Sequence, residues 1–252
     1  MTPTVVVAPA KLTLSLRIVG VRPDGYHRIE AEMVTLDLAD ELRICARDDR
    51  PPGAAPGSTV AVAAAGTGFG VPVGEDNSVL RALALVGRRA DVELHKRIPA
   101  GGGLGGGSAD AAAVLRWAGV DDPTVAAGLG ADVPFCVVGG RARVRGIGEV
   151  VEPLPFEPRR LTLVLPPFGC ATPAVYRAWD ELGGPTADGP NDLEPAALRV
   201  EPRLARVRDE LGDSTGETPV LAGSGSTWFV PGAHPGPGRL VVRTTPASSP
   251  AG

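Results

Sequence analysis

A run of glycine between a strand-like segment and an alanine-rich segment has the composition best suited to chemistry. Residues 99–110 read Pro-Ala-Gly-Gly-Gly-Leu-Gly-Gly-Gly-Ser-Ala-Asp. Apolar and charged residues alternate through 91–98, which predicts a half-buried strand. The alanine-rich segment predicts a helix that is capped by Ser108, has Asp110 in its first turn and ends at Gly119. A glycine loop leading into a helix N-terminus presents backbone N–H groups and the positive end of the helix dipole. The sequence therefore predicts an anion site, with phosphate as its occupant.

Three other interpretations of the glycine run are weaker. Flexible linkers are often glycine-rich, but they rarely lie between a patterned strand and a capped helix. A Walker loop needs lysine before its Ser or Thr, and Gly107 precedes Ser108 here. Residues 101–106 do fit G-x-G-x-x-G, yet a dinucleotide fold needs a second strand ending in an acidic residue, and residues 120–123 turn directly into another helical segment.

Lys11 and Thr13 are predicted to point the same way on a strand near the N-terminus. Side chains alternate between the two faces of a strand, so the opposite face takes the apolar set Leu12, Leu14, Leu16 and Ile18. A tight turn then brings Tyr26 and His27 side by side. By pattern alone, Lys11 is more often an ordinary solvated lysine than a catalytic group.

Several polar residues stand where helices are expected to begin. Asp132 precedes a predicted helix with Pro134 in its first turn, and Asn77 or Ser78 caps another. Thr172 opens a further helix, in which Val175, Tyr176 and Trp179 are assigned to core packing. Capping is the common role of Asp132 and Asn77 in such positions.

Composition bounds the class of protein. The chain has 252 residues, a formal charge of −4 and 43% hydrophobic residues, which allows one large domain or two modest ones. The slight acidity argues against nucleic-acid binding. Three widely spaced cysteines favour neither a disulfide framework nor a zinc site, and no signal peptide or membrane-spanning run stands out. We therefore expect a cytoplasmic protein with no nucleic-acid or membrane partner.

Two segments rich in proline and glycine limit the secondary structure. Residues 48–74 predict loops around a hairpin that includes a short strand near Thr59. Residues 231–238 exclude a helix, so a strand at 239–243 is expected to follow directly. The tail from Thr244 is expected to be disordered.

Several motifs together carry a family resemblance. The run from Pro99 to Ala111 resembles the ATP loop of the GHMP kinases, which include galactokinase and the homoserine and mevalonate kinases. Residues 10–14, with Asp-Gly-Tyr-His at 24–27, resemble the N-terminal signature of the diphosphocytidyl-methylerythritol kinases within that family. Gly-Ala-Asp-Val-Pro at 130–134 resembles their catalytic-aspartate motif. Residues 220–229 resemble the third GHMP motif, which supports the first glycine loop and lines the site.

The resemblance implies an α+β fold of two domains, with the active site in the cleft between them. The expected division is an ATP-binding domain at 1–150, a trimmed C-terminal domain at 151–243 and a tail at 244–252. ATP would phosphorylate the 2-hydroxyl of 4-diphosphocytidyl-2-C-methyl-D-erythritol, a step in non-mevalonate isoprenoid synthesis. Another GHMP small-molecule kinase, or an inactive ATP-binding relative, remains the alternative.

The resemblance also implies roles for individual residues. Lys11 and Asp132 would be catalytic, and Ser108 would help place phosphate or Mg²⁺. Substrate contacts are expected from Thr13, Tyr26, His27 and Thr172, although the family usually has asparagine at the position of Thr13. ATP contacts are expected from Pro99, Ala100, Gly101, Gly102, Gly103, Leu104, Gly105, Gly106, Gly107, Ser108 and Ala109, together with Asn77 and Lys96. The protein is expected to be a monomer or a weak homodimer.

Overall fold

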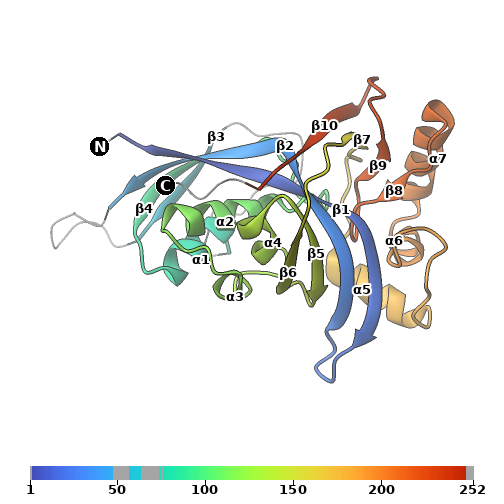
Figure 1. Ribbon diagram of the computed structural model, residues 1–252, viewed down its shortest axis with the longest axis horizontal. Helices are drawn as coiled ribbons and strands as arrows, with labels where there is room; N and C mark the ends of the chain where they lie inside the picture. Colours follow the sequence, from blue (N-terminus) through green and yellow to red (C-terminus); the bar gives the residue numbers. More distant parts are fainter. Residues whose placement is uncertain (1, 48–56, 64–73, 75, 248–252) are drawn as a thin grey trace.

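A long antiparallel hairpin forms the spine of the computed structural model, which describes residues 2–47, 57–63, 74 and 76–247 (Figure 1). Strand β1 (Thr4–Val21) pairs with β2 (His27–Ala46) along nearly its whole length. The turn between them is closed by a hydrogen bond of 2.8 Å from Arg22 N to Tyr26 O. The register shifts at three points along β1, between Pro9 and Lys11, Thr13 and Ser15, and Ile18 and Gly20.

Strand β2 also organises the rest of the first half. Its C-terminal part pairs with β4 (Ala90–His95) and its N-terminal part with β5 (Arg141–Gly146), which in turn pairs with β6 (Val150–Leu154). Strand β3 (Thr59–Ala63) pairs in parallel with β4.

The short strand predicted near Thr59 is confirmed as β3, whereas the rest of the hairpin predicted within 48–74 falls largely on residues that the structure does not describe. Parallel neighbours need a crossover connection, and helix α1 (Ser78–Leu85) lies between β3 and β4 in the chain. Residues 48–56 and 64–73 lie outside the described residues.

Four helices accompany this half of the sheet. In Figure 1, α1, α2 (Gly106–Trp117), α3 (Pro123–Ala126) and α4 (Val133–Val138) gather on one side of the hairpin. Small buried alanines let α2 pack against β1, α1 and α4. The helix ends as predicted, because Gly119 takes the left-handed conformation and Val120 N donates to Leu115 O, as in a Schellman motif.

The second half is built on the antiparallel strands β7 (Arg160–Val164), β8 (Val220–Leu221), β9 (Trp228–Pro231) and β10 (Arg239–Thr245). Helices α5 (Thr172–Glu181), α6 (Glu194–Val200) and α7 (Arg203–Thr215) stand at this end of the molecule (Figure 1). Residues 232–238, all of them described, connect β9 to β10 without a helix, as predicted.

Strand β10 links the two halves. After pairing with β7 it continues through Thr244 and Thr245, which pair with Leu36 and Thr35 of β2. The expected tail from Thr244 therefore needs correction, since backbone pairing to β2 holds the first two of its residues in the sheet. Residues 248–252 lie outside the described part.

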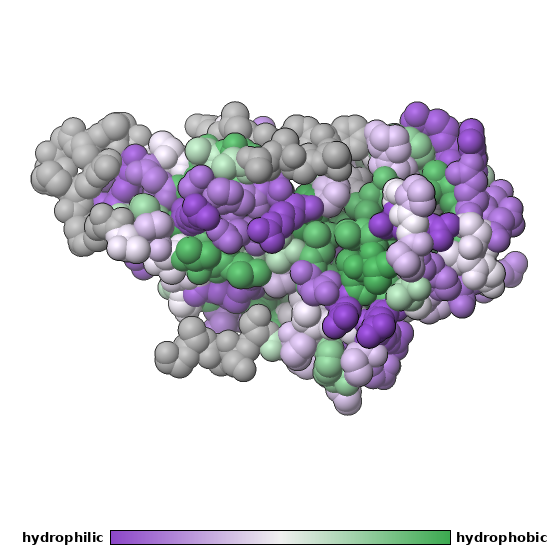
Figure 2. Space-filling model, turned by 90° about the horizontal axis from the view of Figure 1, so that it is seen from above, coloured by the Kyte–Doolittle hydropathy of each residue, from purple (hydrophilic) through white to green (hydrophobic). Residues whose placement is uncertain are grey.

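The arrangement is an α+β fold, as expected. Seen from above, the molecule carries hydrophilic residues over much of its surface and a band of apolar residues across its middle (Figure 2). Among the described residues, none of the helices combines the length and apolar character needed to cross a bilayer.

Candidate active site

A cavity of about 880 Å³ brings together most of the residues singled out in the sequence. Its walls come from β1, β2, α1, the glycine loop and α2 in the first half, and from α5 and the turn before β9 in the second. Among the predicted site residues, those that line it are Lys11, Thr13, Tyr26, His27, Gly101, Gly103, Gly105, Gly106, Gly107, Ser108, Asp132 and Thr172.

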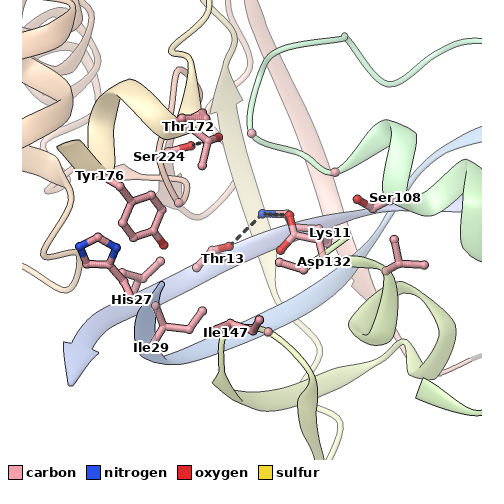
Figure 3. A pocket seen from close by; sticks show the side chains of 18 of the residues that line it. Lys11, Thr13, His27, Ile29, Ser108, Asp132, Ile147, Thr172, Tyr176 and Ser224 are labelled. Atoms are coloured by element: carbon pink, nitrogen blue, oxygen red, sulfur yellow. Dashed lines mark hydrogen bonds and ion pairs between the residues drawn. The ribbon is translucent and has the colours of Figure 1, made fainter. Parts of the chain in front are cut away.

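Lys11 and Asp132 form an ion pair in this cavity (Figure 3). Lys11 Nζ lies 3.2 Å from Asp132 Oδ2, and it also donates a hydrogen bond of 3.2 Å to Thr13 Oγ1. Asp132 stands at the N-cap position of α4, yet its side chain makes no capping hydrogen bond and is 33% exposed. Its carboxylate faces the cavity and not the helix, so the capping interpretation is wrong for this aspartate.

The irregularity of β1 decides which side chains face the cavity. Lys11 and Thr13 share a face, as predicted. The expected apolar face does not persist, however, because the register shifts between Thr13 and Ser15 and Leu16 also lines the cavity. A bulge of this kind moves the following residues to the other face of the sheet.

The glycine loop leads into α2 earlier than predicted. The helix begins at Gly106, with Gly105 as N-cap in the left-handed conformation, so Ser108 lies within the first turn and does not cap the helix. A Cβ at Gly105 would lie 2.7 Å from Lys11 Cγ, so close approach as well as backbone conformation requires glycine there. The first hydrogen bond within the helix runs from Ala109 N to Gly105 O. The preceding N–H groups therefore point along the helix axis toward the cavity end of α2.

A second glycine turn, residues 222–227, packs against the first. A Cβ at Gly103 would lie 2.7 Å from Gly225 O and 2.8 Å from Ala222 O, so the two backbones touch. Thr227 Oγ1 donates a hydrogen bond of 2.5 Å to Gly102 O. The expected support of one loop by the other is therefore present in the geometry.

Asn191 holds the second turn from behind. Its Nδ2 donates hydrogen bonds to Leu221 O at 2.8 Å and Gly223 O at 2.7 Å, and its Oδ1 accepts from Leu193 N. Asn191 is buried, and it fixes the strand end from which Ser224 reaches the cavity.

The far end of the cavity is aromatic. His27 Nε2 lies 2.8 Å from Asp180 Oδ1, and its ring lies 4.8 Å from that of Tyr176 and 5.4 Å from that of Trp179, between centroids. Tyr26, in contrast, is 61% exposed. These groups form a platform on which a flat polar ring can stack and hydrogen-bond.

Tyr176 lines the cavity as well as packing against the core, so core packing alone does not describe its position. Its ring points into the cavity between His27 and Thr172 (Figure 3). Burial, with the nearby charge of Asp132, raises the pKa of its phenol to about 12, so the side chain remains neutral. Helical spacing alone could not separate a residue packed in the core from one that faces a cavity on the same side.

Thr172 meets Ser224 across the cavity. Their hydroxyl oxygens lie 2.8 Å apart, which joins α5 to the second glycine turn. Ser224 was not among the residues predicted for the site, although its position between two glycines of the third motif is typical of a residue that a tight turn exposes.

Comparisons with known proteins agree with this geometry. A model of the GHMP kinases N terminal domain matches residues 77–140. The 4-diphosphocytidyl-2-C-methyl-D-erythritol kinase of Paracoccus denitrificans (strain Pd 1222) is 37% identical over 241 residues, which cover 88% of this chain and 84% of that protein. The kinase of the same name from Paramagnetospirillum magneticum (strain ATCC 700264 / AMB-1) is 35% identical, covering 100% of this chain and 96% of the relative. The chain belongs to the 4-diphosphocytidyl-2-C-methyl-D-erythritol kinase family, a branch of the GHMP kinases.

Solved structures give the same result. The crystal structure of a 4-(cytidine 5'-diphospho)-2C-methyl-D-erythritol kinase superposes with a TM-score of 0.74 at 30% identity, covering 98% of this chain and 100% of that one. Mevalonate kinase of Methanococcus jannaschii, at 12% identity and a TM-score of 0.55 over 91% of this chain and 90% of that one, shares the fold. As a member of this kinase family, the chain is an enzyme whose phosphoryl donor is ATP.

Some residues expected near ATP do not line the cavity: Asn77, Lys96 and, in the glycine run, Pro99, Ala100, Gly102, Leu104 and Ala109. Asn77 is buried and caps α1 by accepting a hydrogen bond of 2.8 Å from Val79 N. Lys96 is buried between two carboxylates, those of Asp40 and Asp110, at 2.7 Å from Asp110 Oδ2. Contact of either residue with ATP stays a prediction.

The cluster of Lys96, Asp40 and Asp110 stabilises the base of the phosphate loop. Asp40 Oδ1 also accepts hydrogen bonds from Arg97 N at 2.5 Å and Ile98 N at 2.8 Å. Burial, with the charge of Asp40, raises the pKa of Asp110 to about 7, while Lys96 opposes the rise. Asp110 is thus a buried member of this cluster in the second turn of α2, and its predicted place in the first turn is wrong.

Oxygen ligands for Mg²⁺ are few in the part of the chain that the structure describes. No group of three or more His, Cys, Asp or Glu side chains gathers there as a metal site. The cavity does offer the Ser108 hydroxyl and the Asp132 carboxylate. Mg²⁺ usually keeps water ligands and binds one or two protein oxygens together with substrate phosphates, so this sparse set fits an ion that arrives with ATP.

Proposed function

We propose that this enzyme transfers the γ-phosphoryl group of ATP to the 2-hydroxyl of 4-diphosphocytidyl-2-C-methyl-D-erythritol, in isoprenoid precursor synthesis. The observation that carries the proposal is the Lys11–Asp132 pair, which faces the same cavity as the N-terminus of α2. The N-terminus of α2 suits a phosphate chain, and the Lys11–Asp132 pair suits an alcohol. Phosphoryl transfer requires the attacking alcohol and the leaving phosphate to be held in line.

Asp132 is the base of the proposed reaction. Its carboxylate accepts the proton of the attacking hydroxyl as the new oxygen–phosphorus bond forms and the bond to the β-phosphate bridging oxygen breaks. The electron pair of that bond leaves with ADP. Lys11 orients the carboxylate and stabilises the negative charge that develops on the attacking oxygen.

The glycine loop and Ser108 hold the phosphates in this mechanism. Backbone N–H groups at the start of α2 hydrogen-bond the phosphate oxygens, with the helix dipole adding positive potential. Ser108 would help to hold Mg²⁺, which supplies further charge neutralisation on the phosphates when bound.

The aromatic end of the cavity is proposed to take the cytosine. His27 is held by Asp180 and stacked near Tyr176, and a nucleobase has both the flat face and the polar edge that such a platform recognises. Thr13 lies beside Lys11 and is proposed to position the alcohol, with Thr172 on the opposite wall.

A phosphorus NMR time course tests the function. Purified protein, MgATP and 4-diphosphocytidyl-2-C-methyl-D-erythritol are expected to yield ADP and a new phosphomonoester resonance, whose carbon coupling identifies the phosphorylated hydroxyl. An unchanged spectrum with ATP bound would reject this acceptor and favour the activity of another GHMP small-molecule kinase. The threonine at position 13, where the family usually has asparagine, raises that possibility.

Location and assembly complete the proposal. A small-molecule kinase acting on soluble metabolites is proposed to work in the cytoplasm as a monomer or weak homodimer.

A further inference from the structure

The proposed reaction brings two polyanions into one cavity, the triphosphate of ATP and the diphosphate of the acceptor. In the described part of the chain, the lysine and arginine residues that line it are Lys11, Arg81 and Arg177. Lys11 is already paired with Asp132, so its charge is largely compensated. Lys96, beneath the loop, is likewise surrounded by two carboxylates.

Arg81 lies on the side of the glycine loop. It stands one turn after Ser78 on α1, so the two side chains share a helix face. A Cβ at Gly107 would lie 3.3 Å from Ser78 Oγ, which places this face of α1 against the first turn of α2. Among the described residues, no carboxylate forms an ion pair with Arg81, and its side chain is exposed toward the cavity.

Arg177 lies on the opposite side. It follows Tyr176 on α5, on the helix face that Thr172 and Asp180 also contribute to the cavity. Tyr176 stands between the His27 ring, 4.8 Å away, and Asp132; burial and, after it, the charge of Asp132 raise the pKa of the tyrosine. Tyr176, the chain neighbour of Arg177, thus marks the stretch of cavity between the aromatic platform and the reacting pair, and Arg177 lines the same cavity. Arg177, too, has no carboxylate partner within ion-pair distance in the described chain.

We propose that Arg81 binds the phosphates of ATP and that Arg177 binds the diphosphate of the acceptor. The assignment rests on the proposed function, because only a diphosphate-bearing acceptor has an anion between its ring and its reacting hydroxyl. A guanidinium group can donate two parallel hydrogen bonds to phosphate oxygens, which gives both affinity and orientation. Arg177 then makes the enzyme discriminate against acceptors that lack the diphosphate.

Two single substitutions separate the roles. Arg81→Gln is expected to raise the dissociation constant for ATP about ten-fold, with acceptor binding within about two-fold of wild type. Arg177→Gln is expected to raise the dissociation constant for the acceptor about ten-fold, with ATP binding within about two-fold of wild type. It should also weaken the binding of CDP about ten-fold while leaving the binding of cytidine nearly unchanged. Isothermal titration with each ligand alone measures both constants. Arg206→Gln, at an 85% exposed α7 residue paired with Glu210, is the matched control and changes neither.

Thermal unfolding establishes that each variant is folded. Arg81→Lys and Arg177→Lys keep the positive charge but lack the planar guanidinium group that donates two parallel hydrogen bonds. The lysine variants are expected to recover part of the lost affinity. The assignment would be overturned if either glutamine variant kept its affinities for both ATP and the acceptor within two-fold of wild type. It would also be overturned if both variants weakened the binding of the same ligand. Wild-type protein that binds ATP but neither binds nor phosphorylates the acceptor would overturn the proposed function and the Arg177 role with it, whereas the ATP titration still decides the role of Arg81.

Discussion

Lys11 Nζ lies 3.2 Å from Asp132 Oδ2, and the pair joins two elements that are far apart in the sequence. Lys11 comes from a buried position on β1, whereas Asp132 comes from the start of α4. Neither residue needs the other for its local structure, because Asp132 makes no capping hydrogen bond. The pairing therefore serves the cavity, and its effect is expected in the rate of turnover.

Asp132→Asn is expected to lower kcat by roughly 10²–10⁴, because the amide cannot accept the proton of the attacking hydroxyl. Binding of ATP is expected to stay within about two-fold of wild type, since the backbone loop is intact. Steady-state kinetics and nucleotide titration measure the two effects. Asp122→Ala is the control: Asp122 does cap α3, accepting from Thr124 N at 2.8 Å, so its loss should cost about 1 kcal/mol of stability without slowing turnover. Joint loss of ATP binding and turnover in Asp132→Asn would indicate a structural role instead.

Gly103→Ala is expected to separate the two glycine turns, because the new Cβ would lie 2.7 Å from Gly225 O. Gly119 has the same φ of +76° but nothing within 4 Å of its Cβ position, so Gly119→Ala carries the conformational strain alone. We expect Gly119→Ala to cost about 1 kcal/mol of unfolding free energy and Gly103→Ala about 1–3 kcal/mol more. Urea unfolding and ATP titration provide the measurements, with ATP affinity falling only in Gly103→Ala. Equal effects of the two substitutions would mean that the loops do not depend on their mutual contact.

The residues that sequence analysis located best were those whose motifs fix both residue type and local backbone. Lys11, Asp132 and the glycine loop belong to this group, and the cavity brings all three together. The predictions that failed depended on tertiary packing. Ser108 looked like an N-cap, but Gly105 can adopt the left-handed conformation close to Lys11, so the helix starts earlier.

Tyr176 and the pairing of the short strand β3 show two limits of sequence patterns. Helical spacing identifies the inward face of α5 but not the cavity that Tyr176 meets there. The short strand near Thr59 is confirmed as β3, but its described partner is β4, and this parallel pairing depends on the intervening α1, which proline and glycine content does not indicate. Such long-range pairings leave little local signal.

Asp110→Asn is expected to change how stability depends on pH. The pKa of Asp110 is raised from 3.8 to about 7, so the folded state binds its proton between these values while the unfolded state releases it. The contribution of Asp110 to the free energy of unfolding therefore falls as pH rises through this window, by about 1 kcal/mol per pH unit. Asparagine cannot ionise, so the difference in unfolding free energy, wild type minus variant, should decline with rising pH.

Urea unfolding at several pH values between about 5 and 7 measures that difference. Asp122→Asn is the matched control, because hydrogen bonds from Thr124 lower the pKa of Asp122 from its ordinary value, which already lies below this range. A wild-type-minus-variant difference that is flat for Asp110→Asn would show that Asp110 is already ionised beside Lys96 at pH 5.

Thr13→Val is expected to lower kcat about ten-fold, because Lys11 Nζ loses the hydroxyl oxygen that accepts its hydrogen bond at 3.2 Å. Valine has nearly the shape of threonine, so the buried strand should remain packed, and Thr13→Ser should stay within about two-fold of wild type because it keeps the hydroxyl. Thr13→Asn introduces the residue usual in the family, whose amide oxygen can accept from Lys11 while its NH₂ group donates to the acceptor. We therefore expect Thr13→Asn to retain turnover and to lower the KM for the alcohol. Steady-state kinetics with ATP saturating measure both parameters, and full activity of Thr13→Val would show that the hydroxyl neither positions Lys11 nor contacts the acceptor.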